Sequence, residues 1–130
     1  LINILEFLKE NKIKMAVATS SSRKYAMSKI CDVGIEGYFD MIICGDMVTK
    51  SKPDPQIYKM ACDGLGVDYA SCIAFEDSPN GIRSAYVAGI NPIMIPDLLA
   101  DAPEEVEEMI VAKLEDLDEA IKFLKNILEK

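Results

Sequence analysis

The sequence predicts an α/β fold in three layers, with a parallel β-sheet covered by helices on both faces. Two observations lead to this prediction. Short apolar runs alternate with amphipathic stretches along the 130-residue chain, and the apolar runs are nearly continuous, which is typical of strands buried on both faces. No internal repeat, low-complexity segment or linker interrupts the pattern, so we expect one compact unit.

Four apolar runs are expected to form the main strands of the sheet. Each is five or six residues long and is bounded by polar or turn-forming residues. The predicted strands are residues 14–19 (KMAVAT), 40–45 (DMIICG), 72–76 (CIAFE) and 91–96 (NPIMIP), with a further short strand near Lys113.

Helices are expected before, between and after these strands. The predicted helices are residues 1–12, 22–31, 55–65, 78–89 and 117–128, with a weaker helix around 103–110. Capping chemistry marks several of their ends. Asp54 precedes Pro55, which suits the first helical position, and Gly66 and Gly89 follow the last helical turns.

The net charge of −8 is concentrated near the carboxyl end, where residues 101–130 contain ten acidic and four basic side chains. A nucleic-acid partner would require a basic patch instead. No apolar run approaches the ~20 residues of a membrane-spanning helix. The first residues lack the pattern of a signal peptide and carry Ile2, Leu5 and Leu8 at helical spacing. We therefore expect a cytoplasmic protein that binds neither nucleic acid nor membranes.

Cysteine and histidine usage narrows the chemistry further. Cys31, Cys44, Cys62 and Cys72 form no CxxC pair, so we expect buried structural thiols in a reducing cytosol rather than a zinc site. The chain contains no histidine, which excludes Ser-His-Asp and Cys-His catalysis by its own residues. Acid–base chemistry must therefore depend mainly on carboxylates or lysine.

Polar residues follow the first two predicted strands. Thr19 to Ser22 end the first, where hydroxyls and backbone N–H groups at a strand-to-helix turn can hold an anion. Helix capping is the alternative interpretation. Lys52 follows the second strand between Ser51 and Pro53, in a stiff turn from which it could neutralise a phosphate. A solvent-exposed lysine is the alternative there.

Adjacent carboxylates, Glu76 and Asp77, end the third strand. Paired acids beside an apolar interior suit a hard cation such as Mg²⁺, which takes oxygen ligands, although an acidic helix cap would also explain them. Hydroxyl, lysine and acids at three successive strand ends together indicate phosphoryl transfer, because the carboxyl ends of parallel strands meet at one edge.

Three segments resemble the second, third and fourth motifs of the haloacid dehalogenase-like superfamily. They are VATSSS (17–22), KSKPDPQIY (50–58) and FEDSPNGIRSAYVAGI (75–90), and the resemblance covers about residues 1–100. It is most similar to the branch of beta-phosphoglucomutase and small sugar-phosphate phosphatases. It implies a Rossmann-like form of the predicted fold, close helix packing at Gly81 and a turn shaped by Asn80.

The resemblance also implies roles for the polar residues. Thr19 would bind the transferring phosphoryl group through its hydroxyl, and Ser20 would assist through its backbone N–H. Lys52 would neutralise the phosphate and the attacking carboxylate. Asp77 would bind Mg²⁺, the implied cofactor, with Glu76 either a second ligand or a partner of one.

The first motif of this family, an Asp-x-Asp run that ends a strand and supplies the nucleophile, is missing. The only similar spacing, Asp116-x-Asp118, lies in the acidic tail before an amphipathic helix. The helical cap of this branch is also missing. We therefore expect residues 1–130 to be an incomplete core domain that lacks a central strand between 14–19 and 72–76. Those two strands would either pair directly or receive another segment between them.

The predicted function is that of a Mg²⁺-dependent phosphatase that acts through an aspartyl-phosphate in the full-length parent. Its expected substrates are small phosphorylated metabolites, a class that includes sugar phosphates. A phosphomutase and a non-catalytic remnant of the fold are the alternatives, with a dehalogenase a weaker one. We expect little or no turnover from these 130 residues alone. Self-association through the open sheet edge is a further hypothesis.

Overall fold

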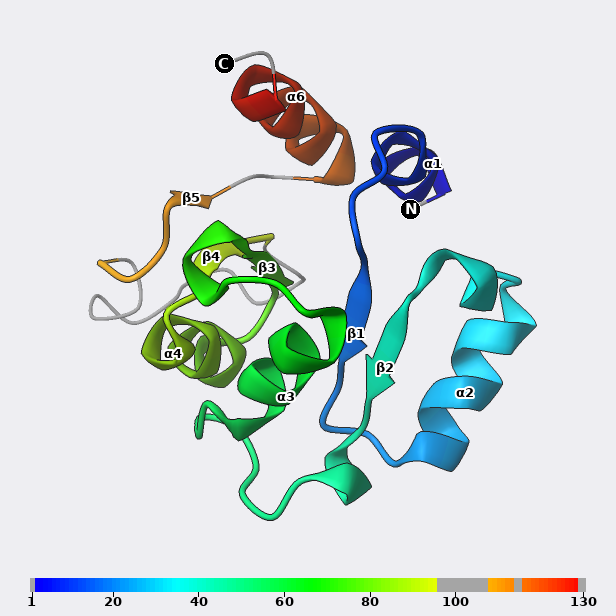
Figure 1. Ribbon diagram of the computed structural model, residues 1–130, viewed down its shortest axis with the longest axis vertical. Coiled ribbons are helices and arrows are strands. Elements are labelled where there is room, and N and C mark those ends of the chain that lie inside the picture. The colour runs from blue at the N-terminus through cyan, green and yellow to red at the C-terminus, as the bar shows by residue number, and fades with distance from the viewer. Residues whose placement is uncertain (1, 96–107, 114–115, 129–130) are drawn as a thin grey trace.

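The computed structural model describes residues 2–95, 108–113 and 116–128, in which helices and strands alternate as predicted (Figure 1). The strands are β1 (Ala16–Ala18), β2 (Met41–Ile43), β3 (Ile73–Glu76), β4 (Asn91–Met94) and β5 (Ala112–Lys113). The helices are α1 (Ile2–Glu10), α2 (Arg23–Asp32), α3 (Gln56–Leu65), α4 (Pro79–Ala88) and α6 (Leu117–Leu128). Most of the helix expected around 103–110 lies outside the described residues.

Three short 3-10 helices were not predicted: η1 (Glu36–Tyr38), η2 (Gly45–Met47) and η3 (Tyr69–Ser71). Each lies in a connection next to a strand, where a single tight turn satisfies a few backbone groups without an extended apolar pattern. Their short length is the reason that periodicity in the sequence does not reveal them. The four main strands are also shorter than predicted, although Thr19 N and Ile95 N, just beyond β1 and β4, still donate hydrogen bonds to Ile43 O and Glu76 O of the neighbouring strands.

Gly66 and Gly89 end α3 and α4 as predicted, whereas Pro55 and Ser78 each lie one residue before a helix rather than within it. The Ser78 hydroxyl accepts a hydrogen bond of 3.1 Å from the third residue of α4, and Gly89 ends that helix with φ +88°. The Asp54 carboxylate accepts a bond of 2.9 Å from Gln56 N at the start of α3, and Gly66 ends α3 with φ +69°. None of the helices in the described ranges is long and apolar enough to cross a membrane.

The strands pair in parallel, which confirms the predicted α/β class. β1 pairs with β2, and β3 pairs with β4, which pairs with β5. Figure 1 shows the two groups beside one another, with β1 and β3 as their facing members. Within the described residues no strand pairing joins β1 to β3, so the inner edges of both strands lack a backbone partner.

Two apolar clusters on opposite faces of the strands give the predicted three layers. One cluster joins α3 and α4 to the strands, with Ile57, Ala85 and Ile43 among its buried members. The other joins α1, α2 and α6 to the opposite face, with Leu5 and Leu124 in its interior. The sheet is therefore covered on both sides, which explains why its strands are apolar throughout.

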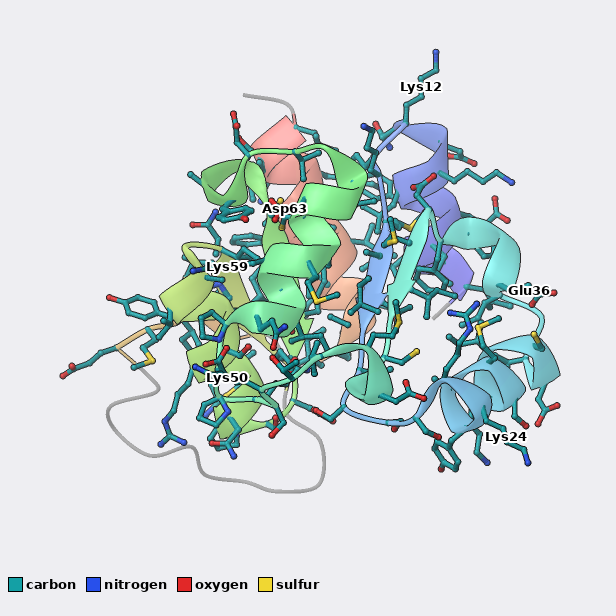
Figure 2. All side chains as sticks on the ribbon, turned by 60° about the horizontal axis from the view of Figure 1, so that its bottom comes forward. Lys12, Lys24, Glu36, Lys50, Lys59 and Asp63 are labelled. Carbon is teal, nitrogen blue, oxygen red and sulfur yellow. The ribbon has the colours of Figure 1, made fainter. Side chains whose placement is uncertain are left out.

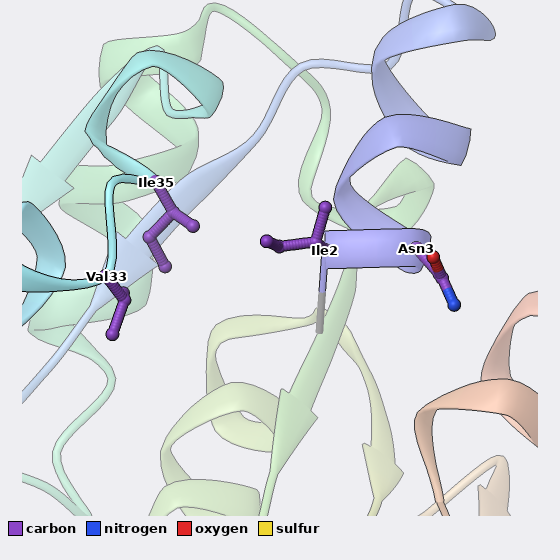
Figure 3. A pocket seen from close by; sticks show the side chains of 4 residues that line it. All are labelled: Ile2, Asn3, Val33 and Ile35. Atoms are coloured by element: carbon purple, nitrogen blue, oxygen red, sulfur yellow. The ribbon is translucent and has the colours of Figure 1, made fainter.

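The apolar stripe of α1 differs from the predicted one. Ile4 and Leu5 are buried, whereas Ile2 is 54% exposed because the helix packs on α6 with a face centred on those two residues. Ile2 points instead into a shallow hollow that it lines with Asn3, Val33 and Ile35 (Figure 3). Val33 and Ile35 precede β2, so this hollow lies at the amino-terminal edge of the strands, away from their carboxyl ends.

The four cysteines are free thiols, and two of them match the expectation of burial. Cys44 and Cys62 are buried, and Cys72 is half-buried. The expectation is wrong for Cys31, which is exposed because it lies on the outer side of α2, next to the buried Ile30.

Candidate functional site

The loop after β1 holds the hydroxyl groups of the candidate site. Thr19 N donates a hydrogen bond of 3.0 Å to Ile43 O, which extends the β1–β2 pairing by one residue. The Thr19 hydroxyl oxygen accepts a bond of 3.2 Å from Ser21 N and so turns the chain toward α2. Ser22 caps α2. Helix capping therefore accounts for Ser22, whereas Thr19 is half-buried and the exposed Ser20 contributes neither strand pairing nor a cap.

Residues that follow β2 fix this loop from the other side. Gly45 N donates a hydrogen bond of 2.7 Å to Ser21 O, and a Cβ atom on Gly45 would lie 2.1 Å from Ser20 O. The Asp46 carboxylate accepts bonds of 3.1 and 3.2 Å from Arg23 N at the start of α2. Sequence reasoning missed both roles. The sequence pattern that could have indicated them is the Gly-Asp pair at the end of the predicted strand 40–45. This pair lies at the same edge of the sheet as the loop after β1.

Replacing Gly45 with Ala tests how closely these two segments must approach. Because the new Cβ atom would meet the backbone of Ser20, the hydroxyl loop must move. We expect the free energy of unfolding to fall by roughly 1–3 kcal/mol. Gly37→Ala is the control, since a Cβ atom there meets nothing within 4 Å. Equal stability of the two variants in urea unfolding would contradict the close approach.

Lys52 lies at the centre of the candidate site. Its ammonium group donates a hydrogen bond of 3.1 Å to Ala18 O at the end of β1 and forms an ion pair with Glu76 Oε1 at 2.6 Å. The side chains are only 11% and 8% exposed for Lys52 and Glu76, respectively. Lys52 therefore connects the carboxyl ends of β1 and β3, and the interpretation as a solvent-exposed loop lysine is wrong.

Tyr58 completes the surroundings of the buried carboxylate. Its hydroxyl donates a hydrogen bond to Glu76 Oε1, and its ring centroid lies 5.2 Å from Lys52 Nζ. Burial raises the pKa of the Tyr58 phenol, and the charge of Glu76 raises it further. The phenol therefore stays protonated and remains a donor. This role was not predicted, although Tyr58 lies on the buried face of the amphipathic α3.

Gly81 provides the space for this carboxylate. A Cβ atom at Gly81 would lie 2.0 Å from Glu76 Oε2 and 2.5 Å from Oε1. The predicted close packing at Gly81 is therefore a contact between the first turn of α4 and the Glu76 side chain. Asn80 is exposed, and its side-chain oxygen accepts a bond of 3.0 Å from Arg83, within the same turn.

The adjacent acids occupy different environments. Glu76 is buried against Lys52, whereas Asp77 is exposed at the start of the connection to α4. Neither acid caps α4, because Ser78 does. The Asp77 charge also contributes to the raised pKa of Tyr58, after burial and Glu76.

These residues offer a partial ligand set for Mg²⁺. The described residues contain no cluster of three or more Asp, Glu, Cys or His side chains. Mg²⁺ is usually held by one or two carboxylates together with substrate phosphate oxygens and water. Asp77, an exposed hard oxygen donor next to Glu76 in the chain, fits that pattern, whereas Glu76 already uses Oε1 for Lys52 and Tyr58.

A second hollow lies on the outer side of α3, near the labelled Lys50, Lys59 and Asp63 of Figure 2. Two acidic side chains, Asp54 and Asp63, line it together with the lysines, so its charges balance. The side-chain oxygen of Gln56 already accepts bonds from the loop at this position. It is therefore a weaker candidate for an anion site than the surroundings of Lys52.

Comparison with known proteins identifies the family of this chain. A family model described as haloacid dehalogenase-like hydrolase matches residues 1–95. The phosphorylated carbohydrates phosphatase of Thermotoga maritima is 36% identical over 125 residues, which cover 95% of this chain and 57% of that protein. The chain thus spans little more than half the length of this relative.

Solved structures show the same fold. A Thermotoga maritima structure assigned to a beta-phosphoglucomutase is 34% identical, with a TM-score of 0.88 over 96% of this chain and 58% of that chain. CbbY from Rhodobacter sphaeroides in complex with phosphate is 30% identical, with a TM-score of 0.79 over 88% of this chain and 52% of that chain. The chain described here belongs to the haloacid dehalogenase-like hydrolases.

Proposed function

We propose that the protein that contains this chain is a Mg²⁺-dependent phosphatase of small phosphorylated metabolites, with sugar phosphates the favoured class. The observation that supports this most is the position of Lys52, a largely buried cation between the ends of β1 and β3. The hydroxyl of Thr19 follows Ala18, and the carboxylate of Asp77 follows Glu76, so both flank the two atoms that Lys52 contacts. The name of the Thermotoga relative supports the substrate class.

The nucleophile of this reaction is proposed to come from a further strand between β1 and β3. Each of these strands has an inner edge without a backbone partner among the described residues, and Lys52 reaches across the space between their ends. An aspartate at the end of such a strand would lie next to the Lys52 ammonium. Residues 1–130 would then form an incomplete core domain with little turnover of their own.

In the proposed mechanism, the aspartate oxygen attacks phosphorus and the bond from phosphorus to the substrate oxygen breaks. The departing oxygen takes a proton from the second aspartate of the same Asp-x-Asp motif, which gives an aspartyl-phosphate and an alcohol. Lys52 and Thr19 stabilise the negative charge on the phosphoryl oxygens. Water then cleaves the aspartyl-phosphate and releases inorganic phosphate. Bound Mg²⁺, held in part by Asp77, would supply further neutralisation of the phosphoryl charge.

A phosphomutase is the second candidate, and the similarity to the Thermotoga maritima structure assigned to a beta-phosphoglucomutase favours it. The phosphoryl group of the same aspartyl-phosphate would then be transferred to a sugar hydroxyl instead of water. Product analysis separates the two activities. A phosphatase releases one inorganic phosphate for each sugar phosphate consumed, whereas a mutase interconverts sugar phosphates with little release.

Asp77→Asn tests the proposed metal site in the complete protein. We expect the Mg²⁺-dependent hydrolysis rate of an aryl phosphate to fall about 100-fold or more, with a higher Mg²⁺ concentration needed for half-maximal rate, because an amide oxygen is a weaker ligand than a carboxylate. Chelation of Mg²⁺ should abolish the wild-type rate. Asp118→Asn, an exposed position on α6, is the control. An unchanged rate and Mg²⁺ dependence in Asp77→Asn would contradict the assignment.

A further inference from the structure

Two thiols lie side by side behind the candidate site. Cys62 Sγ and Cys72 Sγ are 3.4 Å apart, although ten positions separate the residues in the sequence. Cys62 lies on the buried face of α3, and Cys72 immediately precedes β3. Cys62 is buried, whereas Cys72 is half-buried and its thiol also contacts Asp68 O at 3.2 Å.

The pair lies on the same two elements as the Tyr58–Glu76 contact. Cys62 follows Tyr58 by one helical turn, and Cys72 precedes Glu76 by four residues, an even spacing that places both on one face of the strand. Between them, Ala74 packs in the same apolar cluster as Tyr58 and Cys62. A bond between the thiols would therefore join α3 to β3 one turn behind the buried carboxylate.

We propose that Cys62 and Cys72 form a reversible intrachain disulfide, with a low-molecular-weight disulfide such as oxidised glutathione as the oxidant. The Cys72 thiolate attacks the small disulfide, which forms a mixed disulfide and releases one small thiol. Cys62, as its thiolate, then attacks the Cys72 sulfur, which forms the intrachain bond and releases the second small thiol. The two protein thiols are oxidised, the small disulfide is reduced, and their two protons are released or carried by the products.

The environments of the two thiols set this order of events. Cys72 is the more accessible sulfur, so it meets the oxidant first. Burial, followed by the hydrogen bond with Cys72, raises the pKa of the Cys62 thiol to about 12. The second step should therefore accelerate with rising pH. The sulfurs must approach from 3.4 Å to about 2.05 Å for the bond to form.

The remaining cysteines have no comparable neighbour. Cys44 is 0% exposed and belongs to the turn after β2, and the exposed Cys31 lies on α2. Trypsin cleavage also separates the two pairs: Cys62 and Cys72 fall in one peptide, residues 60–83, and Cys31 and Cys44 fall in another, residues 30–50. The proposed link is thus visible as one peptide that has lost two hydrogen atoms.

The test is equilibration of the complete protein in buffers of reduced and oxidised glutathione, followed by acid quenching, alkylation and mass spectrometry. We expect peptide 60–83 to lose two hydrogen atoms, dithiothreitol to reverse the change, and the oxidised protein to unfold at a temperature higher by roughly 5 °C. Cys72→Ala should abolish both effects, and Cys31→Ser should retain both.

Two results would overturn the proposal. One is full alkylation of Cys62 and Cys72 in wild type at every glutathione ratio. The other is a link that joins peptide 60–83 to peptide 30–50, or that forms within 30–50 alone. The wild-type peptide analysis is decisive even if Cys72→Ala does not fold, because it requires no variant.

Discussion

Replacing Lys52 with Met should abolish turnover and lower the free energy of unfolding by about 3–5 kcal/mol. The cause of both effects is the Glu76 carboxylate, which is 8% exposed and would lose its ion-pair partner. Tyr58 would remain as a donor, but a neutral phenol cannot offset a buried charge. The loss of a cation at the phosphoryl site should reduce kcat at least about 100-fold. Urea unfolding and the hydrolysis rate in the complete protein measure the two effects.

Two further variants distinguish the effect of losing this ion pair from the effect of losing any positive charge. Lys50→Met removes an exposed lysine two positions away and should change stability by less than about 0.5 kcal/mol. Glu76→Gln combined with Lys52→Met should recover part of the stability that Lys52→Met loses, because it removes the unpaired charge, while activity stays lost. If Lys52→Met is as stable and as active as Lys50→Met, the Lys52–Glu76 ion pair contributes neither to stability nor to turnover.

Gly81→Ala should destabilise the protein by roughly 2–4 kcal/mol and suppress turnover, although Ala is the better helix former. On helix propensity alone, this change within α4 would stabilise by about 1 kcal/mol. The Cβ atom would, however, lie 2.0 Å from Glu76 Oε2, and the carboxylate cannot move without breaking its contacts with Lys52 and Tyr58. The sign of the change therefore distinguishes the two effects.

Thermal unfolding of Gly81→Ala beside Gly37→Ala measures this sign. Gly37 lies in η1, where an added Cβ atom meets nothing within 4 Å, so its substitution should be nearly neutral. A Gly81→Ala variant that is more stable than wild type, with normal turnover, would show that Glu76 does not occupy the space beside Gly81.

Much of the fold follows from the sequence because its signals are local. Apolar runs, prolines and the glycines after α3 and α4 determine where elements begin and end, and the structure agrees to within a few residues. The 3-10 helices do not follow because they are too short to show a period, and the exposure of Ile2 does not follow because it depends on how α1 packs on α6. The parallel pairing was predictable because helices separate the strands along the chain, and parallel strands need such crossover connections.

The candidate site was predictable as a set of residues but not as a set of contacts. Thr19, Lys52, Glu76 and Asp77 were identified from their positions at strand ends. Which of the two acids faces the interior depends on the direction of the last residue of β3 and on the space that the missing Gly81 side chain leaves. The sequence also cannot show that Tyr58 bonds to Glu76, since the two residues meet only through tertiary packing.

In the proposed site, Thr19, Lys52 and Asp77 act on one phosphate group. A crystal structure of the complete protein with Mg²⁺ and inorganic phosphate tests this most directly. We expect phosphate oxygens within hydrogen-bond distance of Lys52 Nζ and the Thr19 hydroxyl, with Mg²⁺ between the phosphate and the Asp77 carboxylate. Phosphate bound instead beside Lys50 and Lys59 on the outer side of α3, with Mg²⁺ away from Asp77, would contradict the account.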